Sequence, residues 1–148
     1  MAVKAIGDLI SVQDFNQIEK GPVSMTIEPT RVTPQVYLDA ERGILSFKGR
    51  SSPSASLEFY YPIMSGIDRL FAAGSMSLTA NFAMEYFNTS SSKCLFDILK
   101  RLAQFEAQGV DVEINWFYEE ADEDMKETGE DFEELIGMEF NYIEIEEY

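Results

Sequence analysis

The side chains best placed to do chemistry are a run of amides and hydroxyls near the middle of the chain. Asn, Thr and Ser cap helix N-termini, because their side-chain oxygens accept the backbone N–H groups that the first turn leaves unpaired. A hydroxyl there also lies at the positive end of the helix dipole, where a phosphate is favoured. The run therefore predicts either a simple helix cap or a site for a regulatory phosphate. Its residues are Asn88, Thr89, Ser90, Ser91, Ser92 and the following Lys93.

The rest of the sequence lacks the groups that common catalytic sites need. The chain has no His and one Cys, which excludes histidine-based triads, His-ligated zinc and CxxC sites. Neither GxxxxGK[ST] nor GxGxxG occurs. Asp122, Asp124 and Glu127 resemble a calcium loop but lack its glycine and bidentate glutamate. We therefore expect no metal, no cofactor and no catalytic residue.

The single cysteine, Cys94, is predicted to lie one turn inside a helix N-terminus. That position lowers the pKa of a thiol. We interpret Cys94 instead as a small packing residue beside Leu95.

The hydroxyl run is expected to lie between a strand and an amphipathic helix. Apolar and polar residues alternate from Met76 to Phe87, which predicts a strand with one face on the core. Residues 90–108 repeat apolar side chains at spacings of three and four, as a helix with one buried stripe does. The strand's expected core face is Met76, Leu78, Ala80, Phe82, Met84 and Tyr86. The helical stripe is Leu95, Ile98, Leu99, Leu102 and Phe105.

The remaining elements extend this pattern along the chain. We expect Gly129 to weaken the last helix, because Gly is less favourable than Ala in a helix interior. The expected elements are a hairpin of Pro34–Asp39 and Gly43–Arg50, a helix opened by Pro62 and ended by Gly74, a strand from Val110 to Tyr118, a helix capped by Asp122 and running to Leu135, and a strand from Met138 to Ile145.

The element order predicts the fold class. A β-hairpin is followed by helix and strand three times, and strand–helix–strand passages of this length place strands parallel in one sheet. We predict an α/β fold, a single small sandwich with a mixed sheet and helices mainly on one face. Residues 1–24 are expected to form an extension, with a short helix begun by Ser11 and Asp14, and residues 25–148 the domain.

Charge and hydropathy limit the partners. The net charge is −16, and residues 119–148 carry −13 of it, so a nucleic-acid partner is not expected. No apolar run approaches the ~20 residues that span a bilayer, so we expect no membrane insertion. One Cys excludes an internal disulfide and fits a cytoplasmic protein. The acidic segment is interpreted as a solvated face, and the alternative is a surface for a basic partner.

The segment Phe87 to Lys93, after an aromatic strand and before Leu95–Leu102, resembles the signature of the SiaC family of bacterial regulatory phosphoproteins. The resemblance is good over about residues 25–118 and looser over the acidic end, and it implies a STAS-like fold. It also implies partner switching similar to that of anti-anti-sigma factors. Further matches are Thr33-Pro34, Gly49-Arg50-Ser51, Pro53 and Glu58-Phe59-Tyr60.

The resemblance also implies a regulatory cycle. In the family, a dedicated Ser/Thr kinase phosphorylates the motif threonine and a PP2C-type phosphatase removes the phosphate. The unphosphorylated form binds and activates a diguanylate cyclase, which raises cyclic di-GMP and promotes biofilm formation. Carried over to this chain, Thr89 is the phosphoacceptor, and the partner-binding residues are Asn88, Thr89, Ser90, Ser91, Ser92 and Lys93.

The chain departs from the family pattern at Ser54-Ala55, where Glu-Asn is common after the proline. This departure bears on partner identity.

Our leading hypothesis is a non-enzymatic module in which a phosphate on Thr89 blocks docking. A hydrolase-type enzyme is the first alternative, with Thr89 or Ser90 as nucleophile and a carboxylate base; it requires a pocket that brings these groups together. The second alternative is an acidic interaction protein that binds through residues 119–148.

Overall fold

The computed structural model describes residues 24–148. The expected helix at Ser11 and Asp14 lies outside these residues, and the domain boundary after residue 24 stays a prediction. Within the described range, none of the helices has the length and apolarity that crossing a membrane requires. The elements are β1 (Ser24–Ile27), β2 (Gln35–Asp39), β3 (Ile44–Ser51), α3 (Ser56–Ala72), β4 (Ser77–Phe87), α4 (Thr89–Ala107), β5 (Asp111–Glu119), α5 (Glu123–Ile136) and β6 (Phe140–Ile145).

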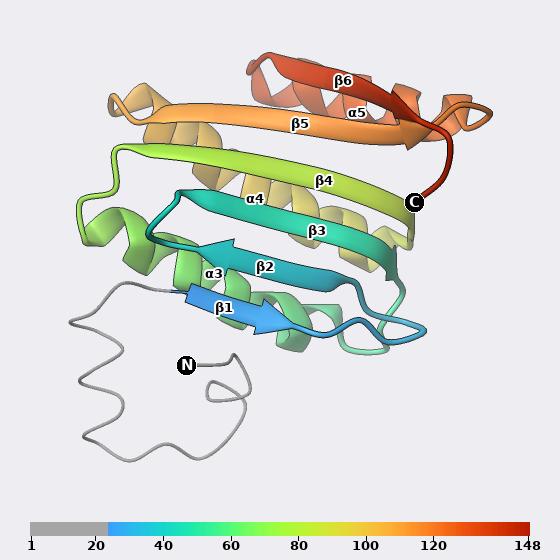
Figure 1. The fold of residues 1–148 in the computed structure, drawn as a ribbon, viewed down its shortest axis with the longest axis horizontal. Coiled ribbons are helices and arrows are strands. Elements are labelled where there is room, and N and C mark those ends of the chain that lie inside the picture. The colour runs from blue at the N-terminus through green and yellow to red at the C-terminus, as the bar shows by residue number, and fades with distance from the viewer. Residues whose placement is uncertain (1–23) are drawn as a thin grey trace.

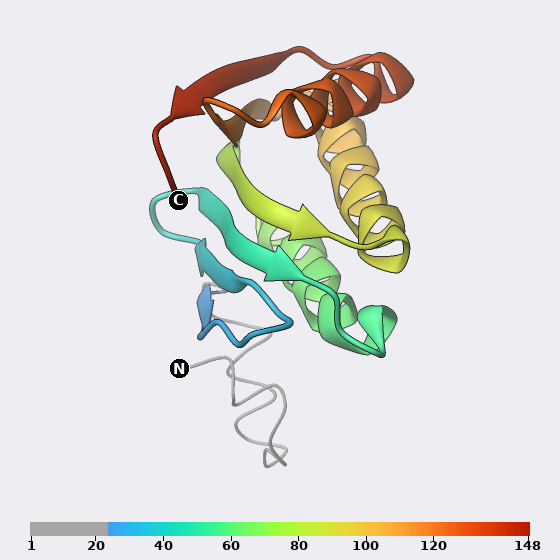
Figure 2. The same ribbon diagram turned by 90° about the vertical axis from the view of Figure 1, so that its right-hand side faces the viewer.

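The strands form one six-stranded sheet in the order of the sequence (Figure 1). β1, β2 and β3 pair antiparallel, which confirms the predicted hairpin, and β3 to β6 pair parallel. Each parallel connection contains a helix, and successive right-handed crossovers in one direction place their helices on the same side. Figure 2 shows α3, α4 and α5 on one face of the sheet. The predicted α/β class, with a mixed sheet and helices on one face, is confirmed.

The core lies between the sheet and this helical layer. Phe47, Phe82 and Trp116 are cross-strand partners on β3, β4 and β5, and their rings stack with centroids 5.2 and 5.7 Å apart. Gly129 of α5 packs against this row, because a Cβ there would lie 2.6 Å from Trp116. The helix-weakening glycine thus permits α5 to approach the sheet closely, which the sequence pattern did not indicate.

The opposite face of the sheet carries a row of polar side chains. Ser46, Asn81, Asn115 and Asn141 lie in register on β3 to β6. Each asparagine donates from Nδ2 to the next residue of the row, over 2.9 to 3.1 Å. The predicted polar face of the strands is therefore present and hydrogen-bonded across the sheet.

The first helix is longer than predicted. We expected Pro62 in its first turn, but α3 begins at Ser56 and Pro62 lies inside it. A proline there removes one backbone donor, yet the helix continues because Tyr60, Ile63 and Ile67 are fully buried. The burial of this apolar stripe outweighs the local effect of the proline.

The expected alternation of β4 fails at both ends. Met76 precedes the strand and is exposed, and Tyr86 is also exposed. The register with β3 shifts between Gly49 and Arg50, so that Met84 and Tyr86 are successive partners. This bulge changes which residues face the helices, and Phe87 packs there against Trp116 and Phe132 instead.

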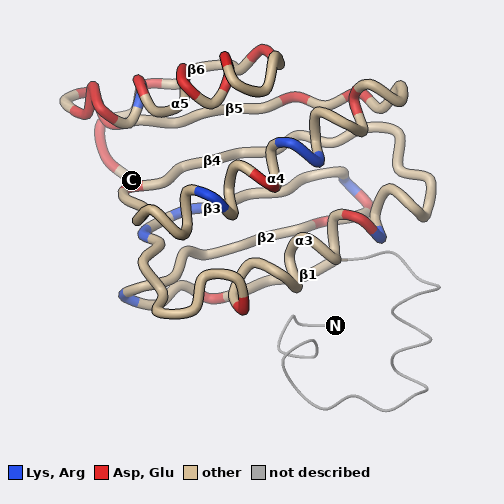
Figure 3. Tube along the Cα trace, turned by 180° about the vertical axis from the view of Figure 1, so that it is seen from behind, with Lys and Arg blue, Asp and Glu red and all other residues tan. Residues whose placement is uncertain are grey.

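Acidic residues gather at one edge of the fold. Figure 3 shows them along α5 and the C-terminal end of the chain. Asp122 caps α5 as predicted, since its side chain accepts a hydrogen bond from the N–H of Met125. A partner for this acidic surface stays a prediction.

Candidate functional site

Asn88 lies at the junction of β4 and α4. Its backbone is extended, with φ −82° and ψ 178°, and its side-chain oxygen accepts hydrogen bonds from the Ser91 N–H at 2.9 Å and the Ser90 hydroxyl at 3.2 Å. Its own N–H donates to the carbonyl of Ser51, the last residue of the neighbouring strand β3. The sequence predicted a cap in this run, with residues 89–92 as the candidates, and the structure assigns the cap to Asn88.

Behind the cap, five hydroxyl groups from β3, α3 and α4 form a continuous hydrogen-bonded chain. The Ser90 and Ser56 hydroxyls lie 2.7 Å apart, and Ser56 lies 3.4 Å from Ser91. Ser51 donates to Ser91 over 2.7 Å and is 2.6 Å from the Tyr60 hydroxyl. Burial raises the pKa of Tyr60 to about 12. This chain ties the first turns of α3 and α4 to the end of β3.

The six predicted site residues divide by exposure. Thr89, Ser90 and Lys93 are exposed, while Asn88 and Ser92 are half-buried. Ser91 is fully buried, so its side chain cannot touch a docked partner. The prediction of Ser91 as a partner-contacting residue is corrected to a supporting role, because its hydroxyl points into the chain behind the cap.

The site also contains residues that sequence reasoning missed. Ser51, Ser56 and Tyr60 support the cap, although none belongs to the predicted run. Two of them lie in the segments Gly49–Ser51 and Glu58–Tyr60 that carried the family resemblance, and this was the available signal. They reach the site because the carboxyl ends of parallel strands β3 and β4 are neighbours.

The N-terminal end of α4 is suited to binding an anion. Asn88 occupies the N–H of Ser91, and among residues 24–148 the backbone N–H groups of Thr89 and Ser90 have no protein acceptor. Free N–H groups and the helix dipole both favour negative charge at this position. Lys93 lies four residues after Thr89 and so projects from the same side of the helix.

The geometry does not supply what a hydrolase requires. In the described part of the chain, the hydroxyl of Thr89 makes no hydrogen bond to a carboxylate, and that of Ser90 bonds to Asn88 and Ser56. A surface groove of about 370 Å³ lies nearby, but its lining contains neither Thr89 nor Ser90. The nucleophile, base and pocket of the hydrolase alternative are therefore not assembled at this site.

Cys94 and the acidic residues also lack the features of a reactive site. Cys94 is buried, and this burial, with the charge of Asp97, raises the pKa of its thiol. The packing interpretation is confirmed by this burial. Within residues 24–148, no three His, Cys, Asp or Glu side chains lie close enough to hold a metal ion.

Comparison with known proteins identifies the family. Residues 27–145 match the sequence model of the SiaC family regulatory phosphoproteins, which covers most of the chain. The chain belongs to the SiaC family. A protein of Pseudomonas aeruginosa strain UCBPP-PA14 is 33% identical over 114 residues, covering 77% of this chain and 90% of the relative.

Solved structures of SiaC agree with this assignment. The crystal structure of apo-SiaC from Pseudomonas aeruginosa is 30% identical, with a TM-score of 0.74 over 82% of this chain and 97% of that one. A second match is the crystal structure of the diguanylate cyclase SiaD in complex with its activator SiaC, from the same organism. There the TM-score is 0.78 and the identity 31%, over 81% of this chain and 98% of that one.

Proposed function

We propose that this SiaC-family protein binds and activates a diguanylate cyclase when Thr89 is unphosphorylated, and that a phosphate on Thr89 prevents docking. The observation that carries the proposal is an exposed threonine in the first turn of α4, in a family of regulatory phosphoproteins. A relative of the same fold, SiaC of Pseudomonas aeruginosa, has been solved in complex with the diguanylate cyclase SiaD, of which it is the activator.

Among residues 24–148, the hydroxyl run offers a kinase one hydroxyl that is both exposed and free of hydrogen bonds, since Ser92 is half-buried. Ser90 shares its hydroxyl with Ser56 and Asn88, and Ser91 is buried. Thr89 is exposed and its hydroxyl makes no hydrogen bond within residues 24–148. This supports Thr89 as the residue that a dedicated Ser/Thr kinase modifies and a PP2C-type phosphatase restores.

The same chemistry explains how the phosphate acts. It adds about −1.5 to −2 charge, and the free N–H groups of Thr89 and Ser90 can donate hydrogen bonds to its oxygens. A partner docked over this helix end would have to dehydrate that charge, which costs several kcal/mol unless a new ion pair forms. Occupancy of one hydroxyl therefore controls binding while the fold stays the same.

The loop before α3 lies at this end of the molecule. Ser54 and Ala55 are exposed and directly precede Ser56, whose hydroxyl bonds to Ser90. Ala55 occupies the N-cap of α3 and makes no side-chain cap bond, whereas an asparagine could. The departure from the family pattern therefore lies beside the proposed docking surface, where it would affect which cyclase is bound.

The decisive experiment compares two forms of the full chain that differ only in a phosphate. Protein with phosphothreonine incorporated at position 89 and protein with free Thr89 are titrated with SiaD, and the cyclic di-GMP formed is measured. We expect the phosphorylated form to bind at least about a hundredfold more weakly and to activate the cyclase correspondingly less. Thr89→Val, which keeps the branched shape and carries no phosphate, should bind SiaD more tightly than the phosphorylated form.

Equal affinity and equal activation by the two forms would overturn the phosphate block. Failure of the unmodified chain to bind SiaD, with SiaC of Pseudomonas aeruginosa binding in the same assay, would overturn the proposed cyclase partner. Protein isolated from its native cell should also carry phosphate on Thr89 by peptide mass mapping.

A further inference from the structure

The first turns of α3 expose a pair of large apolar side chains. Leu57 is 65% exposed and Tyr61 is 64% exposed. They lie four residues apart and therefore on the same side of the helix. With Glu58 and Pro62 they line the groove of about 370 Å³. We call Leu57, Tyr61 and Pro62 the α3 patch.

The α3 patch differs from the other exposed apolar side chains of residues 24–148. Those are single residues on a loop, at a strand end or on α5, and scattered exposure of this kind is ordinary. Among the exposed large apolar side chains of residues 24–148, only Leu57 and Tyr61 lie one helical turn apart. Together they present a continuous apolar surface. The scattered residues are Val32, Met76, Tyr86 and Leu135.

The α3 patch is continuous with the end of α4 that carries Thr89. Leu57 follows Ser56, whose hydroxyl lies 2.7 Å from that of Ser90, the neighbour of Thr89. Figure 2 shows the first turns of α3 and α4 side by side at one end of the fold. A partner that covers Thr89 therefore has the α3 patch within the footprint of an ordinary interface, about 800 Å² per partner.

Size and charge favour this same partner as the occupant. Two side chains are too small a surface to hold a protein alone, but a central Tyr contact commonly carries much of the affinity of a larger interface. The concentrated acidic charge of the molecule lies along α5 and the C-terminal end (Figure 3), whereas the first turn of α3 carries one acidic residue, Glu58. The α3 patch thus offers an apolar contact at the phosphate-sensitive end, where added charge would be most costly.

We propose that Leu57 and Tyr61 are the apolar anchor of the docking surface, receiving apolar side chains of the diguanylate cyclase whose binding Thr89 controls. This inference rests on the proposed function. It assigns the two halves of the surface different tasks: the α3 patch supplies affinity, and Thr89 supplies control. Phosphate at Thr89 then acts by placing a hydrated charge at the rim of a contact that must become dry.

The test is the double variant Leu57→Ala/Tyr61→Ala in the unphosphorylated full chain, titrated with SiaD. We expect the Kd to rise at least tenfold and cyclase activation at a fixed concentration to fall. Met76→Ala/Leu135→Ala is the matched control, because these side chains are 70% and 71% exposed and lie elsewhere. The control should bind SiaD like the unmodified chain, and urea unfolding should show that both variants are folded.

The outcomes separate this inference from the proposed function. If the phosphate on Thr89 weakens binding but the double variant binds SiaD normally, the anchor is refuted and the phosphate control stands. If the unmodified chain does not bind SiaD, both are refuted. If the double variant lowers the sedimentation mass of the chain alone, the α3 patch joins two copies of this chain and the cyclase anchor is refuted.

Discussion

At the scale of single residues, the buried hydroxyl chain explains why the cap has a defined position. Ser51 and Ser91 are both fully buried, so their hydroxyls depend on one another and on Tyr60. Buried polar groups that lose their partner pay the full cost of dehydration. The hydroxyl chain therefore supports the exposed Thr89, and its own polar atoms are hydrogen-bonded. Its contribution to stability can be tested separately from the threonine.

Ser51→Ala should destabilise the protein by about 1–3 kcal/mol, because it leaves the buried hydroxyl of Tyr60 without its partner. Tyr60→Phe should cost less, about 0.5–1.5 kcal/mol, since Ser51 still donates to Ser91. Urea unfolding of the two variants measures the difference. An equal or reversed order of stability would contradict the dependence of Tyr60 on Ser51.

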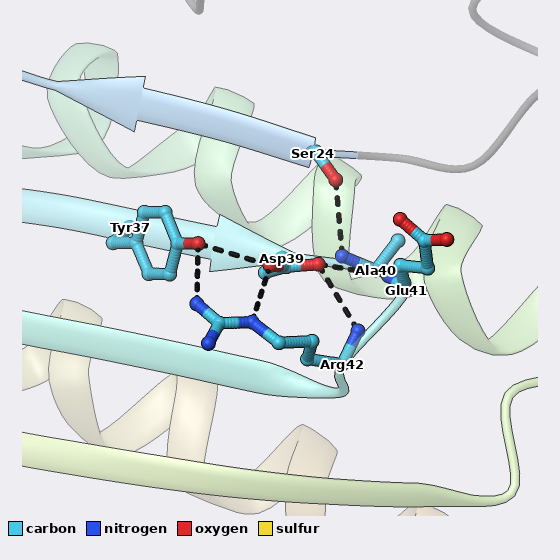
Figure 4. A network of polar contacts seen from close by, with 6 residues as sticks. All are labelled: Ser24, Tyr37, Asp39, Ala40, Glu41 and Arg42. Atoms are coloured by element: carbon cyan, nitrogen blue, oxygen red, sulfur yellow. Dashed lines mark hydrogen bonds and ion pairs between the residues drawn. The ribbon is translucent and has the colours of Figure 1, made fainter.

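At the scale of elements, the turn between β2 and β3 is held by a compact polar network (Figure 4). One oxygen of Asp39 accepts from the backbone N–H groups of Glu41 and Arg42, each at 3.0 Å. The other accepts from the Arg42 side chain and the Tyr37 hydroxyl, each at 2.9 Å. The Arg42 side chain, then its backbone N–H, then Tyr37 lower the pKa of Asp39 to about 2. The hydrogen bonds to the Asp39 carboxylate thus stabilise the turn of the predicted hairpin.

Stability should depend on the ionisation of Asp39. Its pKa is lower in the folded protein than the ordinary 3.8, so its contribution is fully present above about pH 4 and is lost as the pH falls towards 2. Asp39→Asn should therefore lower the urea midpoint at pH 7 and flatten its fall between pH 4 and 2. Urea titrations at several pH values, with Glu41→Gln as the exposed control, measure this. An unchanged pH profile in Asp39→Asn would contradict the assignment.

At the scale of the whole molecule, residues 24–148 form a sheet with helices on one face and no helix on the other, which divides the surface into distinct regions. The first turns of α3 and α4 lie together at one end of the helical layer, and α5 carries acidic charge (Figures 2 and 3). The opposite face of the sheet carries the row of polar side chains from Ser46 to Asn141. The site lies at the carboxyl ends of parallel strands, outside the core. A charge added at Thr89 is therefore surrounded by solvent and backbone N–H donors and not by packed side chains.

Phosphorylation of Thr89 should therefore leave the fold unchanged. We expect amide NMR shifts confined to the first turns of α3 and α4, and a stability gain of about 0.3–1 kcal/mol from the helix dipole. Spectra of the phosphorylated and unmodified chains measure this, with Thr89→Val as the reference for loss of the hydroxyl alone. Shifts spread through β1 or β6 would show a conformational change and contradict a purely local block.

The sequence by itself determined the alternation of strands and helices, the presence of a helix cap in the hydroxyl and amide run and the polar face of the sheet, because these follow from local periodicity and side-chain chemistry. It placed Ser91 on the binding surface and Tyr86 in the core, and both were wrong. Tertiary structure decided these points: a bulge against β3 reversed the end of β4, and packing between α3 and α4 drew Ser91 inward. Ser51, Ser56 and Tyr60 join the site only when parallel strand ends meet, and such long-range contacts leave no periodic signal along the chain.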